Sequence, residues 1–136
     1  MQCVELNQVG NFDPWEQEKI EELFHRDLSD SLSNRLVFEN ERVKLWDLYL
    51  GPGERIPFRK INTNFGWVCP TGGLAICRHG NGKINMVKLE PGDAEYFECR
   101  SKNYVYDLEN VGEHPISINI LEYKWIQSDN SMQLMD

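Results

Sequence analysis

Four cysteines and three histidines are the residues of this chain best suited to bind a metal or to act as nucleophile and base. Cys77 and His79 stand two apart, and residues two apart on a strand share one face. If Cys69 or Cys99 approached them, the group would offer zinc ligands, although the spacing matches no compact Cys/His signature. The alternative, which we favour, is that the cysteines are buried free thiols of a protein in a reducing cytosol.

Other familiar catalytic patterns are missing from the sequence. It contains no recognisable Ser/His/Asp or Cys/His catalytic arrangement, no phosphate-binding loop and no dinucleotide fingerprint. His79 and His114 both fall in predicted turns. The sequence therefore does not identify a catalytic nucleophile or a general base.

Two Pro-Gly pairs, Pro52-Gly53 and Pro91-Gly92, organise the centre of the chain. Each follows an apolar segment and precedes an extended one. Because proline fixes φ and glycine supplies a positive φ, each pair predicts a sharp turn between strands. Glycines in residues 79–82 predict a further hairpin connection. The pattern as a whole predicts an antiparallel sandwich or barrel. The expected strands are 36–38, 42–50, 56–61, 65–69, 74–78, 84–89, 94–99, 104–108 and a last one from 116 towards 126.

Residues 1–34 are predicted to form an arm and a helix before the β region. Asp13 suits a helix N-cap, Pro14 a first turn, and Glu16 completes a capping-box spacing. An apolar stripe at helical spacing follows, made of Trp15, Ile20, Leu23 and Phe24. A solvated acidic face is expected from Glu16, Glu18, Glu21 and Glu22.

The predicted strand 42–50 is apolar on both faces. Trp46, Leu48 and Leu50 share one face, while Leu45 and Tyr49 lie on the other. A strand of this kind predicts that its outer face is also covered, either by the N-terminal helix or by a second subunit.

The spacing of glycines and one asparagine resembles that of the cupins, which are small double-stranded β-helices of the jelly-roll class. The motifs of that family are G-x5-H-x-H-x3-4-E-x6-G and G-x5-P-x-G-x2-H-x3-N. Gly53 and either Gly72 or Gly73 fit the ends of the first motif. Gly92 and Asn110 fit the ends of the second, with three extra residues between them.

The chain most resembles the small single-domain bacterial cupins, including the β-alanine degradation type. This resemblance implies an all-β fold, a double-stranded β-helix with an N-terminal helical segment. The division it suggests is an arm and helix at 1–34, a barrel at 35–126 and a polar C-terminal tail at 127–136. Cupins commonly pair through their sheets, so a homodimer is expected.

The four metal-binding positions of the family are not filled by metal ligands. They hold Arg59, Ile61, Phe65 or Gly66, and Tyr106. An arginine, an alkyl chain and a phenyl ring do not bind divalent metals, and a single tyrosine is a poor ligand. The resemblance therefore implies a cupin without a metal, and we expect no cofactor.

The same frame points Arg59 and Tyr106 into the mouth of the barrel, with Ile61 and Tyr104 as inward neighbours and Asn64 at the rim. A buried guanidinium needs a counter-charge. Arg59 would then bind a carboxylate or phosphate, with Tyr106 as hydrogen-bond donor or general acid. The alternative is that Arg59 pairs with Glu95 or Asp107, or reaches solvent.

Composition limits the partners. The chain has 136 residues, enough for one domain, and a formal net charge of −8. Such a charge disfavours nucleic acid and anionic membrane surfaces as partners. Met1–Asn7 lacks the features of a signal peptide and no apolar run has the length of a membrane span, so a cytoplasmic protein is expected.

Two classes of function remain open. One is a metal-free cupin that binds a small anionic metabolite in the barrel mouth, with metal-independent isomerisation, epimerisation or lysis as a catalytic variant. In that variant the sequence shows no histidine near the mouth to act as a base. The other class is a non-catalytic, structural homodimer.

Overall fold

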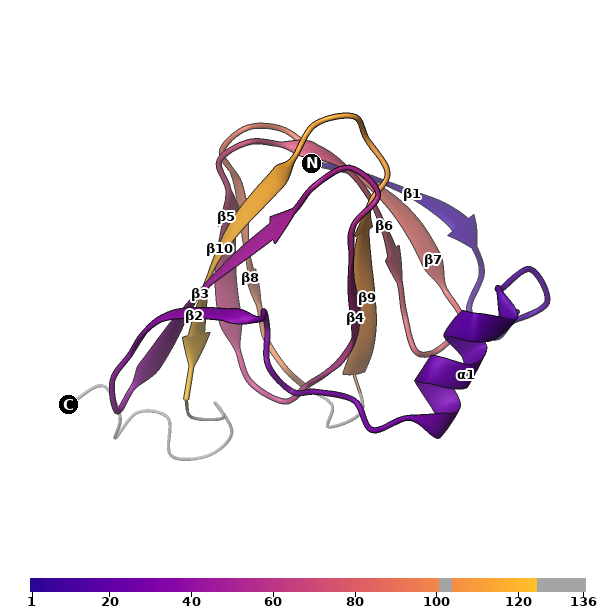
Figure 1. The fold of residues 1–136 in the computed structure, drawn as a ribbon, viewed down its shortest axis with the longest axis horizontal. Helices are drawn as coiled ribbons and strands as arrows, with labels where there is room; N and C mark the ends of the chain where they lie inside the picture. Colours follow the sequence, from indigo (N-terminus) through magenta and orange to yellow (C-terminus); the bar gives the residue numbers. More distant parts are fainter. Residues whose placement is uncertain (101–103, 125–136) are drawn as a thin grey trace.

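A computed structural model describes residues 1–100 and 104–124 of the chain. It contains one helix and ten strands (Figure 1). They are β1 (Gln2–Asn7), α1 (Gln17–His25), β2 (Arg35–Glu39), β3 (Val43–Leu50), β4 (Arg55–Ile61), β5 (Phe65–Cys69), β6 (Gly73–Arg78), β7 (Ile84–Leu89), β8 (Asp93–Phe97), β9 (Tyr104–Asn110) and β10 (Ile116–Tyr123). The predicted tail at 127–136 and the far end of the last predicted strand lie outside the described residues.

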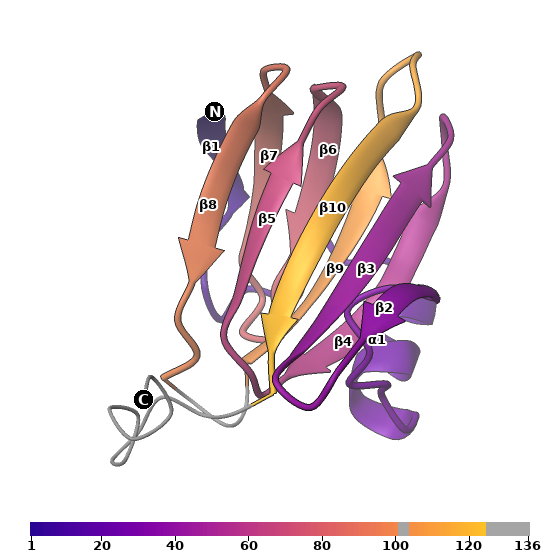
Figure 2. The ribbon, with the colours of Figure 1, turned by 90° about the vertical axis from the view of Figure 1, so that its left-hand side faces the viewer.

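The strands form two antiparallel sheets that face one another (Figures 1 and 2). One sheet has the order β1-β7-β6-β9-β4 and the other the order β2-β3-β10-β5-β8. Apart from the β2–β3 and β6–β7 hairpins, successive strands lie in opposite sheets, which is the arrangement of a jelly-roll double-stranded β-helix. The all-β fold predicted from the sequence is confirmed.

The two Pro-Gly pairs make the turns that were predicted. Gly53 has φ +82° and Gly92 has φ +89°. In each turn the residue after the glycine donates its backbone N–H to the residue before the proline, Glu54 to Gly51 O and Asp93 to Glu90 O, at 3.0 Å. Proline followed by a glycine at positive φ is the pattern of a type II turn.

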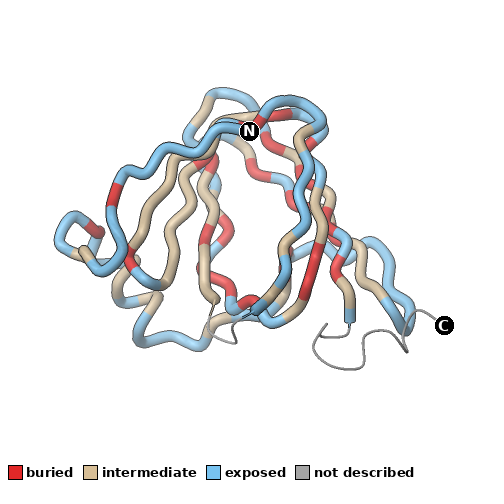
Figure 3. Tube along the Cα trace, turned by 180° about the vertical axis from the view of Figure 1, so that it is seen from behind, coloured by how far each residue is buried: buried red, intermediate tan, exposed pale blue. Residues whose placement is uncertain are grey.

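The core lies between the two sheets (Figure 3). Trp46, Leu48 and Leu50 of β3 point inward and are buried, as the alternation along this strand predicted. Ile116, Ile118 and Ile120 of β10 join them. The structure has no helix in its described part that is long and apolar enough to cross a bilayer.

The start of the helix was predicted wrongly. Asp13 and Pro14 form a turn in which Trp15 N donates to Phe12 O, and α1 begins at Gln17 without a side-chain cap on Glu16. The reason is a tertiary contact. Trp15 stacks on Phe58 at 5.9 Å between ring centroids and donates its Nε1–H to Gly82 O, which holds it outside the helix.

Two further features of the N-terminal region differ from the prediction. Gln2–Asn7, expected as part of an arm, forms edge strand β1, which pairs with β7. Most of its residues are exposed, so it has no burial pattern that would have revealed it. The helix contacts the sheet that contains β4, and it therefore does not cover the outer face of β3 (Figure 2).

Candidate functional site

A cavity of about 260 Å³ lies between the sheets and is the candidate site. Its wall is mostly apolar, and its polar side chains come chiefly from β6, β7 and β9 and from the β6–β7 hairpin. The apolar wall includes Leu48, Phe65, Trp67, Val87, Ile118 and Ile120. The polar side chains are Cys77, His79, Asn85, Tyr104 and Tyr106, with Cys3 and Glu95 also contributing.

Strand alternation brings the polar group together. Cys77 and His79 face the cavity while Arg78, between them, bonds Asp107 and Glu109. Cys77 pairs across the sheet with Asn85 of β7. His79 forms an isolated bridge with Tyr106 of β9.

Cys77, His79 and Tyr104 form a chain of contacts. The Cys77 Sγ lies 3.7 Å from His79 Nε2, and the Tyr104 hydroxyl lies 3.2 Å from His79 Nδ1. Since the neutral imidazole has one donor and one acceptor nitrogen, the chain runs in a single direction at any moment. Either the Tyr104 hydroxyl or the Cys77 thiol donates to the ring.

Burial keeps this group uncharged near neutral pH. It lowers the pKa of His79, and the nearby Lys83 ammonium lowers it further. It raises the pKa of Cys77 and of Tyr104 well above their ordinary values. The site thus offers a neutral imidazole, a thiol and a phenol rather than ions.

An aromatic wall continues from this chain. Phe65, Phe97, Tyr104 and Tyr106 follow one another with centroid separations of 5.1, 4.9 and 5.8 Å. Burial raises the pKa of Tyr106 as well, so its hydroxyl stays protonated. Within the described residues this hydroxyl and the Asn85 amide have no hydrogen-bond partner, so both are available to a ligand.

Arg59 does not line this cavity. It pairs with Tyr106 in the sheet and is 8% exposed. Its Nη1 donates to Ser31 O at 3.1 Å, and its Nε has no partner within the described residues. Burial lowers the pKa of Arg59. The residue instead lines a second hollow of about 350 Å³ beside the end of α1.

The internal carboxylates considered for Arg59 do not reach it. Asp107 accepts hydrogen bonds from Arg55 Nε at 2.6 Å and from Arg78 Nη1 at 2.9 Å. Glu95 is an exposed residue at the cavity. No carboxylate of the described chain lies within ion-pair distance of Arg59.

The other predicted site residues lie in different places. Tyr104 and Tyr106 line the cavity. Ile61 is fully buried in the core opposite Tyr104. Asn64 is 2% exposed, and its Oδ1 accepts a hydrogen bond from the Cys99 N–H at 2.7 Å. Its side chain therefore holds the segment that follows β8.

The family's metal positions do not fit a metal in this chain. Arg59, Ile61, Phe65 and Tyr106 offer one phenol oxygen among them. The neighbouring carboxylate on β9, Asp107, is bonded by Arg55 and Arg78 instead. In the residues that the structure describes, no group of three or more His, Cys, Asp and Glu could hold a metal ion. Of the four residues considered for zinc, Cys77 and His79 are in contact, while Cys69 contacts Thr71 and Cys99 contacts Ile61 O.

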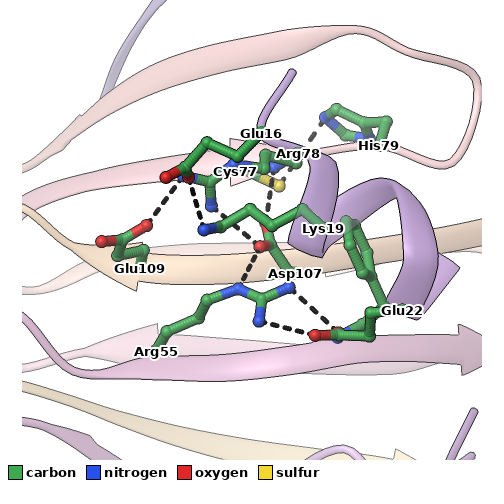
Figure 4. A network of polar contacts seen from close by, with 10 residues as sticks. Glu16, Lys19, Glu22, Arg55, Cys77, Arg78, His79, Asp107 and Glu109 are labelled. Carbon is green, nitrogen blue, oxygen red and sulfur yellow. Dashed lines mark hydrogen bonds and ion pairs between the residues drawn. The ribbon is translucent and has the colours of Figure 1, made fainter. Parts of the chain in front are cut away.

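A network of ion pairs lies on the other side of β6 and β9, under α1 (Figure 4). Asp107, with no exposed surface, bonds both Arg55 and Arg78. Arg55 also makes two hydrogen bonds to Glu22 of α1, at 2.8 and 3.0 Å. Glu22, expected on a solvated face, therefore holds the helix on the sheet.

Cys77 and His79 were not predicted from the sequence as cavity residues. Their spacing placed them on one strand face, but His79 was assigned to a turn away from the mouth. The structure corrects this, because the hairpin begins after His79 and its backbone still pairs, His79 N donating to Lys83 O at 2.8 Å. The sequence did contain one indication that both residues reach the same cavity, because Cys77 and His79 stand two apart and so share one strand face.

Comparison with solved structures agrees with this architecture. A cupin domain from Bordetella pertussis Tohama I matches with a TM-score of 0.59 and 17% identity, over 74% of this chain and 99% of that one. The fold is a cupin double-stranded β-helix. An RmlC-like cupin family protein from Methanocaldococcus jannaschii matches with a TM-score of 0.54 and 16% identity, over 74% of this chain and 85% of that one.

A conserved double-stranded β-helix protein from Klebsiella pneumoniae matches this cupin fold with a TM-score of 0.51 and 19% identity, over 70% of this chain and 82% of that one. No family model matches the sequence. No curated protein matches it either. At these identities the similarity concerns the fold alone, and the suggested β-alanine degradation type gains no support from it.

Proposed function

We propose that this cupin-fold protein binds a small, uncharged and mainly apolar molecule in the cavity between its sheets. The observation that carries the proposal is the cavity itself, with an apolar wall and unpartnered polar groups on one side. The Tyr106 hydroxyl and the Asn85 amide would hydrogen-bond a carbonyl or hydroxyl of the ligand. The aromatic wall would pack on its apolar body.

The volume limits the ligand. An engineered cavity of about 150 Å³ holds benzene. The cavity here, at about 260 Å³, suits one substituted ring or two fused rings.

The charge of the lining disfavours the anion expected from Arg59. No arginine or lysine is among the described residues that line the cavity, and Glu95 is its acidic side chain. Met1 also lines the cavity, but its ammonium already pairs with Asp93 at 2.9 Å. An ionised carboxylate would therefore lose its hydration there without gaining an unpaired counter-charge. We therefore propose a neutral ligand and, because the family's metal positions hold no suitable donors, binding that needs no metal.

A thermal-shift screen tests the proposal. Neutral cyclic ketones, phenols and alcohols are compared with carboxylates of the same size. A ligand at about a hundredfold excess over its Kd should raise the free energy of unfolding by about 2.7 kcal/mol. Tyr106→Phe should weaken binding by about 0.5–1.5 kcal/mol, the net contribution of one hydrogen bond.

Tyr49→Phe is the matched control, since Tyr49 is 62% exposed on the outer face of β3. Val87→Phe, which fills the cavity, should abolish the shift. If carboxylates stabilise the protein and neutral compounds do not, the proposal is wrong. If no compound does so, a structural homodimer is the better description.

A second candidate is metal-independent proton transfer, as in an isomerase, epimerase or lyase. The contact between neutral His79 and the Tyr104 hydroxyl favours it, because the pair supplies both a base and an acid. Solvent deuterium incorporation next to the carbonyl of a bound ketone, lost in His79→Gln, would support it. Binding without exchange would exclude it for that ketone.

A further inference from the structure

Cys77 differs from the other cysteines in its access to both the cavity and a base. Its thiol lines the cavity, and its Sγ lies 3.7 Å from the acceptor-capable Nε2 of His79. Cys69 is fully buried and contacts Thr71. Cys3 is exposed at the cavity and has no contact with a histidine in the described structure.

One proton arrangement of the chain aligns three donors in series. If the Cys77 thiol donates to His79 Nε2, then His79 Nδ1 carries the ring proton and donates to the Tyr104 oxygen. The Tyr104 hydroxyl hydrogen is then free for an acceptor in the cavity. The series ends where the carbonyl oxygen of a ligand would lie.

We propose that Cys77 is a covalent addition site for small, neutral α,β-unsaturated carbonyl compounds that enter the cavity. The inference rests on the proposed function, since the cavity must admit a neutral molecule of this size. It goes beyond that function because an unsaturated ligand would form a covalent bond to the protein, whereas a saturated analogue would bind only reversibly.

The step balances without another reactant. The Cys77 sulfur forms a bond to the β-carbon as its proton moves to His79 Nε2. The electron pair of the carbon–carbon double bond shifts to give an enolate, whose oxygen accepts a hydrogen bond from Tyr104 or Tyr106. The proton on His79 then passes to the α-carbon. The product is a saturated carbonyl compound attached to Cys77 through a thioether, and His79 is again a neutral imidazole.

The surroundings of Cys77 select the reagent. Burial raises the pKa of this thiol, so a reagent that needs a preformed thiolate should react slowly. Addition therefore depends on His79 taking the proton as the sulfur–carbon bond forms. Anionic reagents are disfavoured because the wall is mostly apolar and its acidic side chain, Glu95, would repel them.

The experiment uses 2-cyclohexen-1-one, with cyclohexanone as its saturated analogue, on the full chain carrying Cys3→Ser to remove the exposed thiol. Adduct formation is followed by intact-protein mass spectrometry, and the modified residue is identified by peptide mapping. We expect one adduct, at Cys77, that is absent in Cys77→Ala and slowed by excess cyclohexanone.

His79→Gln should slow the adduct by about a hundredfold, the lower range of general-base effects, whereas His114→Gln, at an exposed histidine, should not. The rate of the parent protein should fall at acidic pH as His79 becomes protonated, and His79→Gln should lose that fall. Cyclohexanone binding reports separately on the cavity.

If cyclohexanone shifts the melting temperature but no adduct forms at Cys77, this inference fails and the proposed function stands. If neither compound has an effect, both fail. Equal adduct rates in the parent and His79→Gln would also overturn the inference, because the thiol would then react through accessibility alone.

Discussion

His79 Nδ1 and the Tyr104 hydroxyl lie 3.2 Å apart inside the cavity, and the two residues are separated by 25 positions in the chain. His79 directly follows β6, and Tyr104 is the first residue of β9. Cys77 contacts the other ring nitrogen. The imidazole is thus held on both sides by neutral groups, and burial disfavours its protonated form.

We expect the free energy of unfolding to fall as the pH drops below about 6.5, the ordinary pKa of histidine. The folded pKa of His79 is lowered by burial and by Lys83, so the unfolded chain binds this proton first. The stability due to neutral His79 is complete above the ordinary pKa and is lost as the pH falls towards the folded value. Urea unfolding at a series of pH values measures the slope.

His79→Gln should remove this part of the slope, while His114→Gln should keep it. The remaining acid sensitivity, from carboxylates, lies at lower pH. An unchanged slope between about pH 5 and 7 in His79→Gln would show that His79 is not buried as a neutral ring.

Much of the fold follows from local chemistry in the sequence. The turns at Pro52-Gly53 and Pro91-Gly92 depend only on two neighbouring residues, and they were predicted correctly. The alternation of Ile116, Ile118 and Ile120 likewise fixes which side of β10 is buried. The start of α1 could not be predicted in the same way, since the contact of Trp15 with Gly82 joins residues 67 positions apart.

The site was predicted less well, because it depends on which cavity and which partners each side chain reaches in the folded protein. Arg59 and Tyr106, which the sequence predicted as neighbours, pair across β4 and β9. The Arg59 side chain, however, does not point into the cavity and donates to Ser31 O. That oxygen comes from the segment before β2. His79 faces the cavity because pairing in the β6–β7 hairpin extends one residue beyond β6.

The contact between Glu22 and Arg55 predicts how α1 is held. Burial raises the pKa of Glu22, but the hydrogen bonds from Arg55 and from Phe58 N outweigh it and the net pKa is lowered. Glu22→Gln should lower the free energy of unfolding by about 1.5–3 kcal/mol, the range for a hydrogen bond to a charged group. Glu21→Gln, on the exposed side of the helix, should change little.

Chemical denaturation at several pH values tests this prediction. The Glu22 contribution is present above the ordinary carboxylate pKa and is lost as the pH falls through the lowered folded pKa. The difference between Glu22→Gln and the parent should therefore shrink in strong acid. A difference that stays constant down to about pH 2 would contradict the ion pair as its cause.

The outer face of the β2-β3-β10-β5-β8 sheet predicts a homodimer. Cross-strand pairing aligns one row over all five strands of this sheet: Phe38, Leu45, Leu121, Gly66 and Tyr96. Phe38 and Tyr96 are each 53% exposed, and Tyr49 nearby is 62% exposed. Exposed apolar side chains aligned across one sheet face are typical of an interaction site.

Sedimentation at micromolar concentration should show a dimer that Phe38→Glu together with Leu121→Glu converts to a folded monomer. Val9→Glu is the control, since Val9 is 58% exposed and lies away from this sheet. A parent chain that sediments as a monomer would count against pairing through this face.

The residues at the four metal-binding positions of the cupin family predict how much metal the protein contains. Because the four family positions hold Arg59, Ile61, Phe65 or Gly66, and Tyr106, the protein purified without chelator should contain well under one Fe, Mn, Ni or Zn per chain. Elemental analysis measures this. A stoichiometric metal that survives Cys77→Ala together with His79→Gln would show a site built from other residues.

Arg59 and Arg55 stand four positions apart on β4, yet only Arg55 has carboxylate partners in the described structure. A buried charge without a partner destabilises the folded state. Arg59→Met should therefore leave the free energy of unfolding unchanged or raise it. Arg55→Met, which removes a counter-charge of Asp107, should lower it by about 3 kcal/mol.

The same pair of variants tests whether an anion compensates Arg59 in solution. If phosphate or a small carboxylate binds its guanidinium, either anion should stabilise the parent protein and Arg55→Met but not Arg59→Met. Denaturation with and without added phosphate, at matched ionic strength, separates the two cases. A loss of stability in Arg59→Met as large as that in Arg55→Met, without added anion, would show that Arg59 is already paired within the folded protein.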